Sequence, residues 1–422
     1  MEHSPEARRR ARQEKARQRA EKQARNKKLL IRLGIALAVL VFCGILIISV
    51  TRKAPSPDTP VAESTEATVQ QPVPEATESA TTVIHYAAAG DLNINEATVA
   101  AGGKSYVYTD TFLDVAHLLA GADIASVNFE GNLYGEPYGT SFSAPQSMAN
   151  ALQRAGVDLV QMANSYSINR GISGLQSSID AIRNAGMEPL GVYHNNEEFR
   201  KTKGYTIRTV KGIKLAFVAF TKGMDGMALP YGSEDCVNVL YSDYDSAYQT
   251  INTEKIKSVL SAVQKEKPDI VIALLHWGSE FNNTISKSQT DIIDLMQANG
   301  VDAIIGTHSH YVQKMSFNAE KGQFVAYSLG DFFSDASRAG SEYSVVLDLE
   351  ITKDNATGKA KITGYSYTPI FTVHEPEQPL KVVRIQQAVE AYENNHLQMV
   401  SAETYNKMLY ALERIEARTK GE

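Results

Sequence analysis

A few histidines and carboxylates in this 422-residue chain follow directly on apolar runs. His276 ends the run IVIALL, and both His308 and His310 come just after AIIGT. Asp91 follows AAAG, and Glu130 closes ASVNF. Imidazole nitrogens and carboxylate oxygens are ligands for zinc, manganese and iron, and the same groups can transfer protons. These residue types, placed where apolar runs stop, predict a metal-binding or acid–base centre.

Taken singly, most of these candidates also have a purely structural interpretation. Asp91 can cap a turn, Glu130 can lie in a solvated turn, and His276 can be a hydrogen-bonded core histidine. Asn164, which follows the run VQMA, is a further candidate ligand and equally a cap. Sequence leaves both interpretations open for each of the four.

The pair His308 and His310 is harder to explain structurally. Side chains at positions i and i+2 point the same way along extended backbone, so we expect both imidazoles to face one metal. The only cysteines are Cys43 and Cys236, so no thiolate set is available and no disulfide is expected in the folded part. The donor set predicts one divalent metal, which would be manganese, zinc or iron.

The elements that must position these residues alternate in type along the chain. Short apolar runs predict strands at 83–90, 122–129, 157–163, 213–221, 269–277, 301–307, 324–330, 344–352 and 361–373. Helical patterns are centred near 110–120, 145–155, 172–185, 252–265 and 287–299, with two more helices between 382 and 420. This alternation indicates an α/β domain over 83–373 and a helical tail over 374–422.

Glycines and strand order add detail to this prediction. Three helices end at Gly156, Gly186 and Gly300, where a positive φ caps the last turn. The last strands have no helix between them, so we expect them to be antiparallel. Ligands in α/β folds collect beyond the carboxyl ends of strands, where the candidate residues lie.

The N-terminal part differs sharply from the rest in charge. Residues 1–32 contain twelve Lys and Arg against four Glu, a net charge of +8, which leaves −14 for the other 390 residues out of a total of −6. The stretch 33–50 is uncharged and 18 residues long, near the minimum for spanning a bilayer. We expect a cytoplasmic basic arm at 1–28, a transmembrane anchor at 29–50 and an external location for everything after it.

A polar linker separates this anchor from the folded domain. Residues 51–82 are rich in Pro, Thr, Ser, Glu and Ala, which predicts a disordered extracellular stalk. The basic arm can contact anionic lipid, and the acidic remainder argues against nucleic acid as a partner.

Several longer motifs resemble one known family. They are GDLN (90–93), SVNFEGNL (126–133), ALQRAGVDLVQMANSYSINRG (151–171), GVYHNNEEFRK (191–201), HWGSE (276–280), SKSQTDIIDLMQANGVDAIIGTHSHYVQKMSF (286–317) and FVAYSLGDFFSD (324–335). Together they resemble the CapA group of poly-γ-glutamate capsule biosynthesis proteins. The resemblance implies a calcineurin-like metallophosphoesterase fold, a β-sandwich flanked by helices.

The resemblance also implies roles for individual residues. Asp91 matches the first-strand aspartate of the metal site, Glu130 takes the place of the bridging carboxylate, and the later histidines match His276, His308 and His310. Asn164 is the nearest candidate for the family's asparagine ligand. His276 would also take part in catalysis.

The chain departs from the family pattern at several positions. Ser165 and Tyr166 stand where the family has Asn-His, so Tyr166 becomes the candidate acid, although a phenol with a pKa near 10 is a weak acid at neutral pH. Asn93 replaces a histidine, and Asp331 stands where an asparagine is usual. These changes argue for one complete metal site and against a second.

Two functions follow from the resemblance. In the first, the protein takes part in synthesis or export of poly-γ-glutamate, beside membrane-bound synthase subunits and with the anionic polymer as its substrate. In the second, it is a metal-dependent extracellular hydrolase of phosphoesters or envelope amides. The altered segment at Ser165 and Tyr166 favours the first, and the retained histidines favour the second.

Overall fold

The computed structural model describes residues 80–396 and 400–421. The predicted arm and anchor lie outside these residues, as does the stalk up to residue 79. Thr81 and Thr82, which we assigned to the stalk, instead begin the first strand. Across the described ranges, no helix is both long enough and apolar enough to cross a membrane.

The strands form two sheets. The larger has the order β14-β13-β12-β1-β2-β3-β4, with β11 also paired to β1. Its strands are β1 (Thr81–Asn93), β2 (Ile124–Glu130), β3 (Leu159–Gln161), β4 (Glu188–Leu190), β11 (Asp331–Phe333), β12 (Tyr343–Asp354), β13 (Ala360–Val373) and β14 (Lys381–Arg384). Strands β1 to β4 are parallel, and β12 to β14 are antiparallel.

The smaller sheet has the order β5-β6-β7-β8-β10-β9. Its strands are β5 (Thr206–Val210), β6 (Ile213–Thr221), β7 (Ile270–His276), β8 (Ala303–Thr307), β9 (Met315–Asn318) and β10 (Gln323–Ala326). The central strands β6, β7, β8 and β10 are parallel, so their carboxyl ends lie at the same edge.

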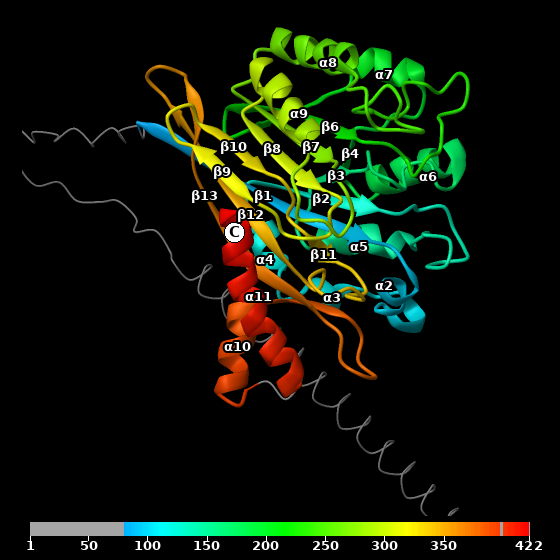
Figure 1. The fold of residues 1–422 in the computed structure, drawn as a ribbon, viewed down its shortest axis with the longest axis vertical. Coiled ribbons are helices and arrows are strands. Elements are labelled where there is room, and N and C mark those ends of the chain that lie inside the picture. Colours follow the sequence, from blue (N-terminus) through cyan, green and yellow to red (C-terminus); the bar gives the residue numbers. More distant parts are fainter. Residues whose placement is uncertain (1–79, 397–399, 422) are drawn as a thin grey trace, which may run out of the picture. The chain divides into compact units, whose positions relative to one another are not determined.

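Most of the helices cover the outer faces of the two sheets, whereas the last two pack against the core between the sheets. In chain order the helices are α2 (Glu96–Ala100), α3 (Thr109–Phe112), α4 (Ala116–Ala120), α5 (Gln146–Arg154), α6 (Gly171–Asn184), α7 (Asn196–Thr202), α8 (Thr253–Lys265), α9 (Lys287–Ala298), α10 (Ile385–Glu393) and α11 (Ala402–Lys420). Figure 1 shows α8 and α9 over the strands of the smaller sheet, while α5 and α6 lie on the larger one.

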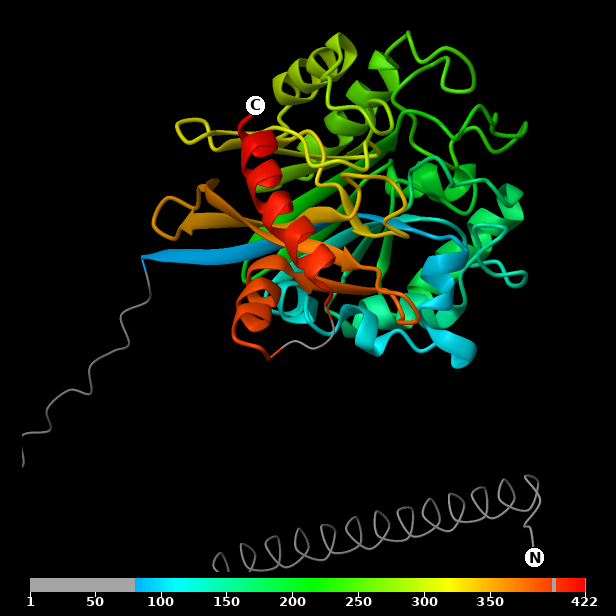
Figure 2. The same ribbon diagram turned by 60° about the horizontal axis from the view of Figure 1, so that its bottom comes forward.

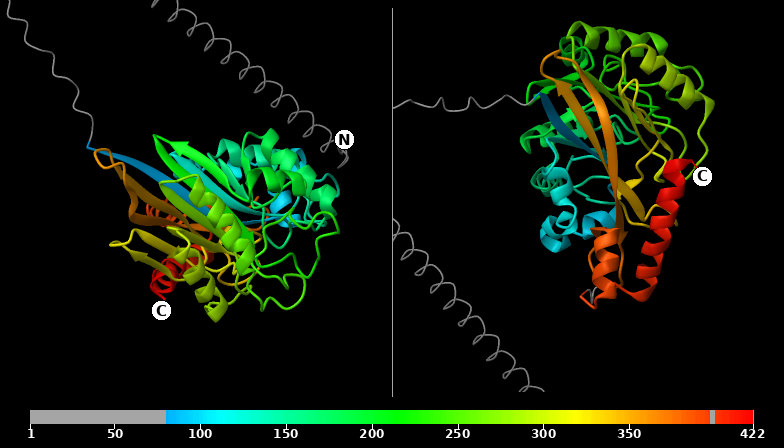
Figure 3. Two further views of the ribbon diagram at one scale, coloured as in Figure 1. Left: turned by 90° about the horizontal axis from the view of Figure 1, so that it is seen from above. Right: turned by 90° about the vertical axis from the view of Figure 1, so that its left-hand side faces the viewer.

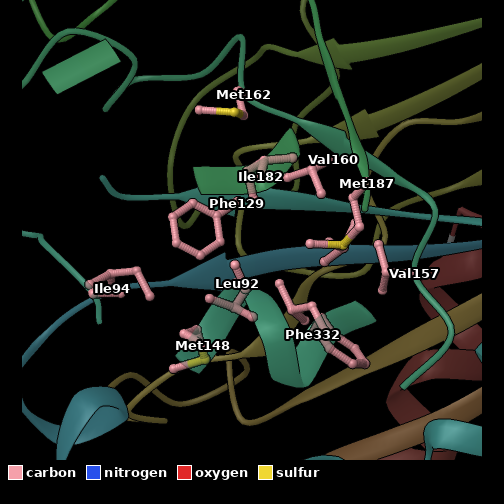
Figure 4. Close-up of a cluster of buried hydrophobic side chains, with 14 of the residues drawn as sticks. Leu92, Ile94, Phe129, Met148, Val157, Val160, Met162, Ile182, Met187 and Phe332 are labelled. Carbon is pink, nitrogen blue, oxygen red and sulfur yellow. The ribbon is translucent and has the colours of Figure 1, made fainter. Parts of the chain in front are cut away.

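The period-two pattern of the strands divides the core into layers. In β6, Leu215 and Phe217 face the core between the sheets, whereas Ala216 and Val218 pack under α8 and α9. On the other side, side chains of β1 and β2 pack against α5 and α6, where Phe129 and Met148 are among the side chains drawn in Figure 4. The predicted α/β sandwich flanked by helices is therefore confirmed.

The segment after residue 373 is built into the sandwich. It opens with β14, which pairs with β13, and only then forms the two expected helices. Met408, Ala411 and Ile415 of α11 are at most 1% exposed and join the core between the sheets. Figure 2 shows α11 in red beside the orange strands, and Figure 3 shows it next to α10. The predicted helices are present, but their apolar faces are part of the main core.

Candidate metal centre

The candidate residues meet where strands of both sheets end. Asp91 lies near the end of β1, Glu130 ends β2, His276 ends β7, and both His308 and His310 follow β8. Asp91, Glu130 and His276 each offer one ligand atom, and these three atoms lie within 4.8 Å of one another. The expected clustering at the carboxyl ends of parallel strands is confirmed for these three side chains.

A second group of the same kind shares Asp91 with the first. It consists of Asp91, His310 and Asp331, whose ligand atoms again lie within 4.8 Å of one another. We call the set of Asp91, Glu130 and His276 the Glu130 half, and the set of Asp91, His310 and Asp331 the Asp331 half. All five side chains are buried. Two donor sets joined by one carboxylate provide more than the single site predicted from the sequence.

The two aspartates are opposite each other on neighbouring parallel strands. Asp91 of β1 pairs with Asp331 of β11, and the Asp91 amide donates to the Gly330 carbonyl at 3.0 Å. This close approach requires glycine, because a Cβ at Gly90 would lie 1.8 Å from Gly330 O. Two buried carboxylates so near each other repel unless a cation lies between them.

In the Asp331 half, the imidazole of His310 supplies that positive charge. Its Nδ1 lies 2.8 Å from Asp331 Oδ1 and 3.7 Å from Asp91 Oδ2. Burial lowers the pKa of His310, but Asp331, Glu130 and Asp91 together raise it well above its usual range. Burial raises the pKa of Asp91 to about 6 despite the nearby imidazole. The raised pKa values of both groups favour a proton between them, where a cation would bind.

In the Glu130 half, an amide takes the same place. Asn128 Nδ2 donates to Asp91 Oδ1 at 2.7 Å and to Glu130 Oε1 at 3.0 Å. His276 Nδ1 lies 3.3 Å from Glu130 Oε1. Burial, and then the Asp91 charge, raises the pKa of Glu130 well above its usual range, whereas burial and the other two histidines lower that of His276.

The expectation that His308 and His310 point the same way in extended backbone is wrong. Their φ angles are +89° and +60°, both in the left-handed region, so the backbone bends after β8. His310 turns to Asp331, while His308 Nε2 lies 3.4 Å from Lys222 Nζ and joins neither half. The His308 amide donates to Asp91 Oδ2 at 3.0 Å, so this bend also positions the shared carboxylate.

Asn164 is placed one layer behind the candidate ligands. Its Nδ2 donates to Asn128 Oδ1 at 3.0 Å and to the Phe129 carbonyl at 2.7 Å, and its Oδ1 accepts from the Tyr166 amide at 3.0 Å. With its amide engaged at both ends, Asn164 fixes the orientation of Asn128. The structure therefore gives Asn164 a positioning role.

Ser165 and Tyr166 follow directly. Ser165 Oγ lies 3.1 Å from His276 Nε2, so the hydroxyl contacts the Glu130 half. Tyr166 is half-buried with its ring centroid 5.0 Å from that of Phe142. Burial, and then the charges of Glu130 and other carboxylates, raises the pKa of Tyr166 further above its usual value. Such a phenol holds its proton more tightly, which weakens it as a general acid.

Two residues of the site were not among the sequence candidates. Asp331 had a signal, because Gly330-Asp331 after an apolar run repeats the pattern of Gly90-Asp91. Lys222 had no sequence signal beyond its position at the end of a strand. It lines a pocket of about 270 Å³, together with Ser165, Gly223, Asp225, Tyr248, Ser279, Glu280 and His308.

The donor sets fit a divalent metal. Each half offers two carboxylates and one imidazole, a hard-to-intermediate set suited to manganese, zinc or iron. The carboxylate pair is a second sign, since a divalent cation would offset the repulsion between Asp91 and Asp331 more fully than the His310 imidazole does. A bound metal would polarise an oxygen of the substrate and lower the pKa of a coordinated water.

Fold and site together define a class, an α/β sandwich with a buried carboxylate and histidine centre that fits divalent metal. The family model of the bacterial capsule synthesis protein PGA_cap matches residues 85–336, and the chain belongs to this family. The predicted CapA resemblance is thereby confirmed at the level of the family.

Individual proteins are similar over part of their length. The chain is 26% identical to the capsule biosynthesis protein CapA of Bacillus anthracis, over 60% of this chain and 60% of that protein. It is 21% identical to the PGA biosynthesis protein CapA of Bacillus subtilis, over 64% of this chain and 67% of that protein. Among solved structures, the calcineurin-like phosphoesterase YfkN of Bacillus subtilis aligns with a TM-score of 0.43 and 16% identity, covering 79% of this chain and 99% of that one.

Proposed function

We propose that this protein takes part in the synthesis or export of a poly-γ-glutamate capsule, and that a divalent metal held by the two halves is part of that role. One observation carries the proposal. The segment matched by the capsule synthesis family, residues 85–336, contains every residue of both halves. The region that defines the family is therefore the region that builds the centre.

The second candidate is a metal-dependent hydrolase of phosphoesters or envelope amides. The observation in its favour is the pair of donor sets sharing Asp91, since two adjacent metals can hold both the attacking and the leaving oxygen. Ser165 and Tyr166 count against ordinary phosphoester hydrolysis, because the raised pKa of Tyr166 leaves this position without a ready proton donor.

The proposal extends to the location of the protein. Residues 29–50 would anchor it in the cell membrane with residues 1–28 in the cytoplasm, where the basic arm would contact anionic lipid. The folded body would lie outside the cell beside membrane-bound synthase subunits, with the anionic polymer as its substrate. The acidic body repels a polyanion except where a metal or a local basic group intervenes, so the polymer would bind at the centre, and nucleic acid is not among the proposed partners.

A genetic experiment separates the two candidates. The gene is deleted in the source bacterium and replaced by wild type, by Asp91→Asn or by the matched control Asp302→Asn. Asp302 directly precedes the first residue of β8, at the end of the strand away from the metal centre. We expect γ-linked glutamate on the cell surface to be lost in the deletion and in Asp91→Asn, and restored by wild type and the control. Unchanged polymer in the deletion strain would contradict the capsule role. Metal-dependent phosphate release by the purified full-length chain, lost in Asp91→Asn, would then favour the hydrolase.

A further inference from the structure

The pocket of about 270 Å³ beside the metal centre has a chemistry of its own. It adjoins the centre through Ser165, whose Oγ lies 3.1 Å from His276 Nε2. Its charged lining consists of one cation, Lys222, and two carboxylates, Asp225 and Glu280. Its volume is below the ~300–1,000 Å³ typical for drug-sized ligands, so it suits one small unit of a larger molecule.

Several groups hold the Lys222 side chain in the lining of this pocket. Its Nζ donates to the Gly278 carbonyl at 2.9 Å and lies 3.4 Å from His308 Nε2. The same atom lies 4.8 Å from the centroid of the Tyr248 ring. An ammonium has three N–H donors, so these two polar contacts leave one donor to point at a ligand.

The backbone around Lys222 is equally constrained. Lys222 follows directly on β6, and its amide donates to the His276 carbonyl at 2.7 Å, which fixes it to the same strand end as the metal centre. The next residue must be glycine, because a Cβ at Gly223 would lie 2.2 Å from Tyr244 O. The charge of Lys222 is therefore preorganised, which lowers the cost of ordering it around a ligand.

The two carboxylates are placed differently from the lysine. Asp225 and Glu280 are exposed, whereas Lys222 is only partly exposed. A ligand would thus meet a partly buried, constrained cation and two exposed carboxylates. A phosphate group carries negative charge only and would be repelled by both carboxylates. A group that carries one positive and one negative charge on substituents of the same carbon fits both parts of the lining.

We infer that this pocket binds an α-amino carboxylate, the group found on free glutamate and at the amino terminus of a γ-linked glutamyl chain. Lys222 pairs with the carboxylate, and Asp225 and Glu280 pair with the ammonium. The inference rests on the proposed function, and it adds that the protein recognises the amino-terminal end of the polymer. Interior units of the polymer carry an amide in place of the ammonium, so they lack the positively charged half of the recognised group.

The test measures binding to the full-length chain by calorimetry, with and without added manganese. The probes are free glutamate, a γ-glutamyl tetramer, the same tetramer acetylated at its amino terminus, and inorganic phosphate. Wild type is compared with Lys222→Met, with the double variant Asp225→Asn and Glu280→Gln, and with the control Lys407→Met, an exposed lysine of α11 paired with Glu403 at 2.7 Å. Metal content is measured for every variant, as a check on the centre that does not depend on the pocket.

We expect the tetramer to bind wild type and the control equally, and to bind Lys222→Met at least about tenfold more weakly, as for loss of a charge-assisted hydrogen bond. Acetylation should weaken binding to wild type and have little effect in the double variant, since the ammonium then has no partner to lose. Metal content should be unchanged in Lys222→Met. Equal affinity for free glutamate and the tetramer would support the same recognition with the free amino acid as the ligand.

Two results would overturn the inference in distinguishable ways. If the tetramer binds but neither acetylation nor Lys222→Met changes its affinity, the pocket is not the binding site and the capsule role stands. If no γ-glutamyl probe binds while phosphate does, both the pocket assignment and the polymer as substrate fail.

Discussion

The two halves of the metal centre contain the same kinds of ligand but are satisfied in different ways without metal. In the Asp331 half, the imidazole of His310, whose pKa is raised by the surrounding carboxylates, lies between two carboxylates. In the Glu130 half, Asn128 donates its amide hydrogens to both carboxylates, and Asn164 holds that amide in place. Metal can enter the first half by displacing a proton, whereas the second requires Asn128 to turn. We therefore expect the Asp331 half to bind metal more tightly.

The largest effect should come from the residue that the halves share. Asp91→Asn removes a ligand from both, so metal should no longer stabilise the fold. In wild type, metal at 100 times its dissociation constant should add about 2.7 kcal/mol to the free energy of unfolding. Thermal unfolding of the full-length chain with and without manganese measures the difference. Asp302→Asn is the matched control, because burial raises the pKa of Asp302 to about 6 as well, yet it lies before the other end of β8.

Substitutions that remove a ligand from only one half test whether the two halves bind metal independently. Asp331→Asn should weaken binding of the tighter metal by about 100-fold or more, because Asp331 is itself a ligand and loss of a group that only supports a ligand costs about 10–100-fold. Glu130→Gln should leave that metal in place and remove the weaker one. Calorimetric titration with manganese distinguishes the two steps. The same loss in both variants would show that the halves are not independent.

The pH dependence of metal binding should follow from the raised pKa of Asp91, which is about 6. Below that pH the carboxylate is protonated, and the metal must displace a proton. The apparent affinity should then fall by about tenfold for each pH unit per proton released. His310, with a pKa well above its usual range, adds a second proton in the Asp331 half at higher pH. Titrations from pH 5 to 8 should therefore be steeper for wild type than for Asp331→Asn, in which His310 loses its nearest raising charge.

The smallest effect on metal affinity is expected from a change at Asn164, which lies behind the Glu130 half. Asn164→Ala leaves Asn128 Oδ1 and the Phe129 carbonyl without their donor, which should lower the free energy of unfolding by about 1–3 kcal/mol. The Asp331 half should keep its affinity. Asn150→Ala is the control, because the Asn150 side chain has one long, exposed hydrogen bond from Gln146 at 3.4 Å. A loss of affinity in the Asp331 half of Asn164→Ala would argue against separate halves.

The sequence predicts the long elements and misses several of the short ones for a physical reason, although the three-residue β3 lies within the predicted strand 157–163. Strands β6 and β12 are long enough for the period-two pattern to show, and β6 was predicted with its observed bounds. Strands β4 and β11 have three residues each and show no period, so they were missed. The three helix-ending glycines have φ of +103°, +88° and +85°, as expected for Gly156, Gly186 and Gly300. At these positions the local sequence is sufficient to predict the backbone conformation.

The sequence predicts only those residues of the candidate site whose positions are set by the ends of parallel strands. Asp91, Glu130 and His276 meet because parallel strands end at one edge. The separation of His308 from His310 depends on a backbone bend with positive φ, a conformation that remains uncommon for histidine and that the local sequence pattern does not predict. The contact of Asp331 with Asp91 depends on the pairing of β11 with β1, two strands about 240 positions apart in the chain. Such long-range pairing is not encoded in any local pattern.

The account depends most directly on Asp91 as the shared ligand. The decisive measurement is the number of metal equivalents retained by the full-length chain at pH 7 after manganese loading and dialysis, in wild type, Asp91→Asn and Asp302→Asn. We predict two equivalents in wild type and in Asp302→Asn, and none in Asp91→Asn. Metal retained by Asp91→Asn at the wild-type level, or a wild-type chain that binds none, would contradict the account.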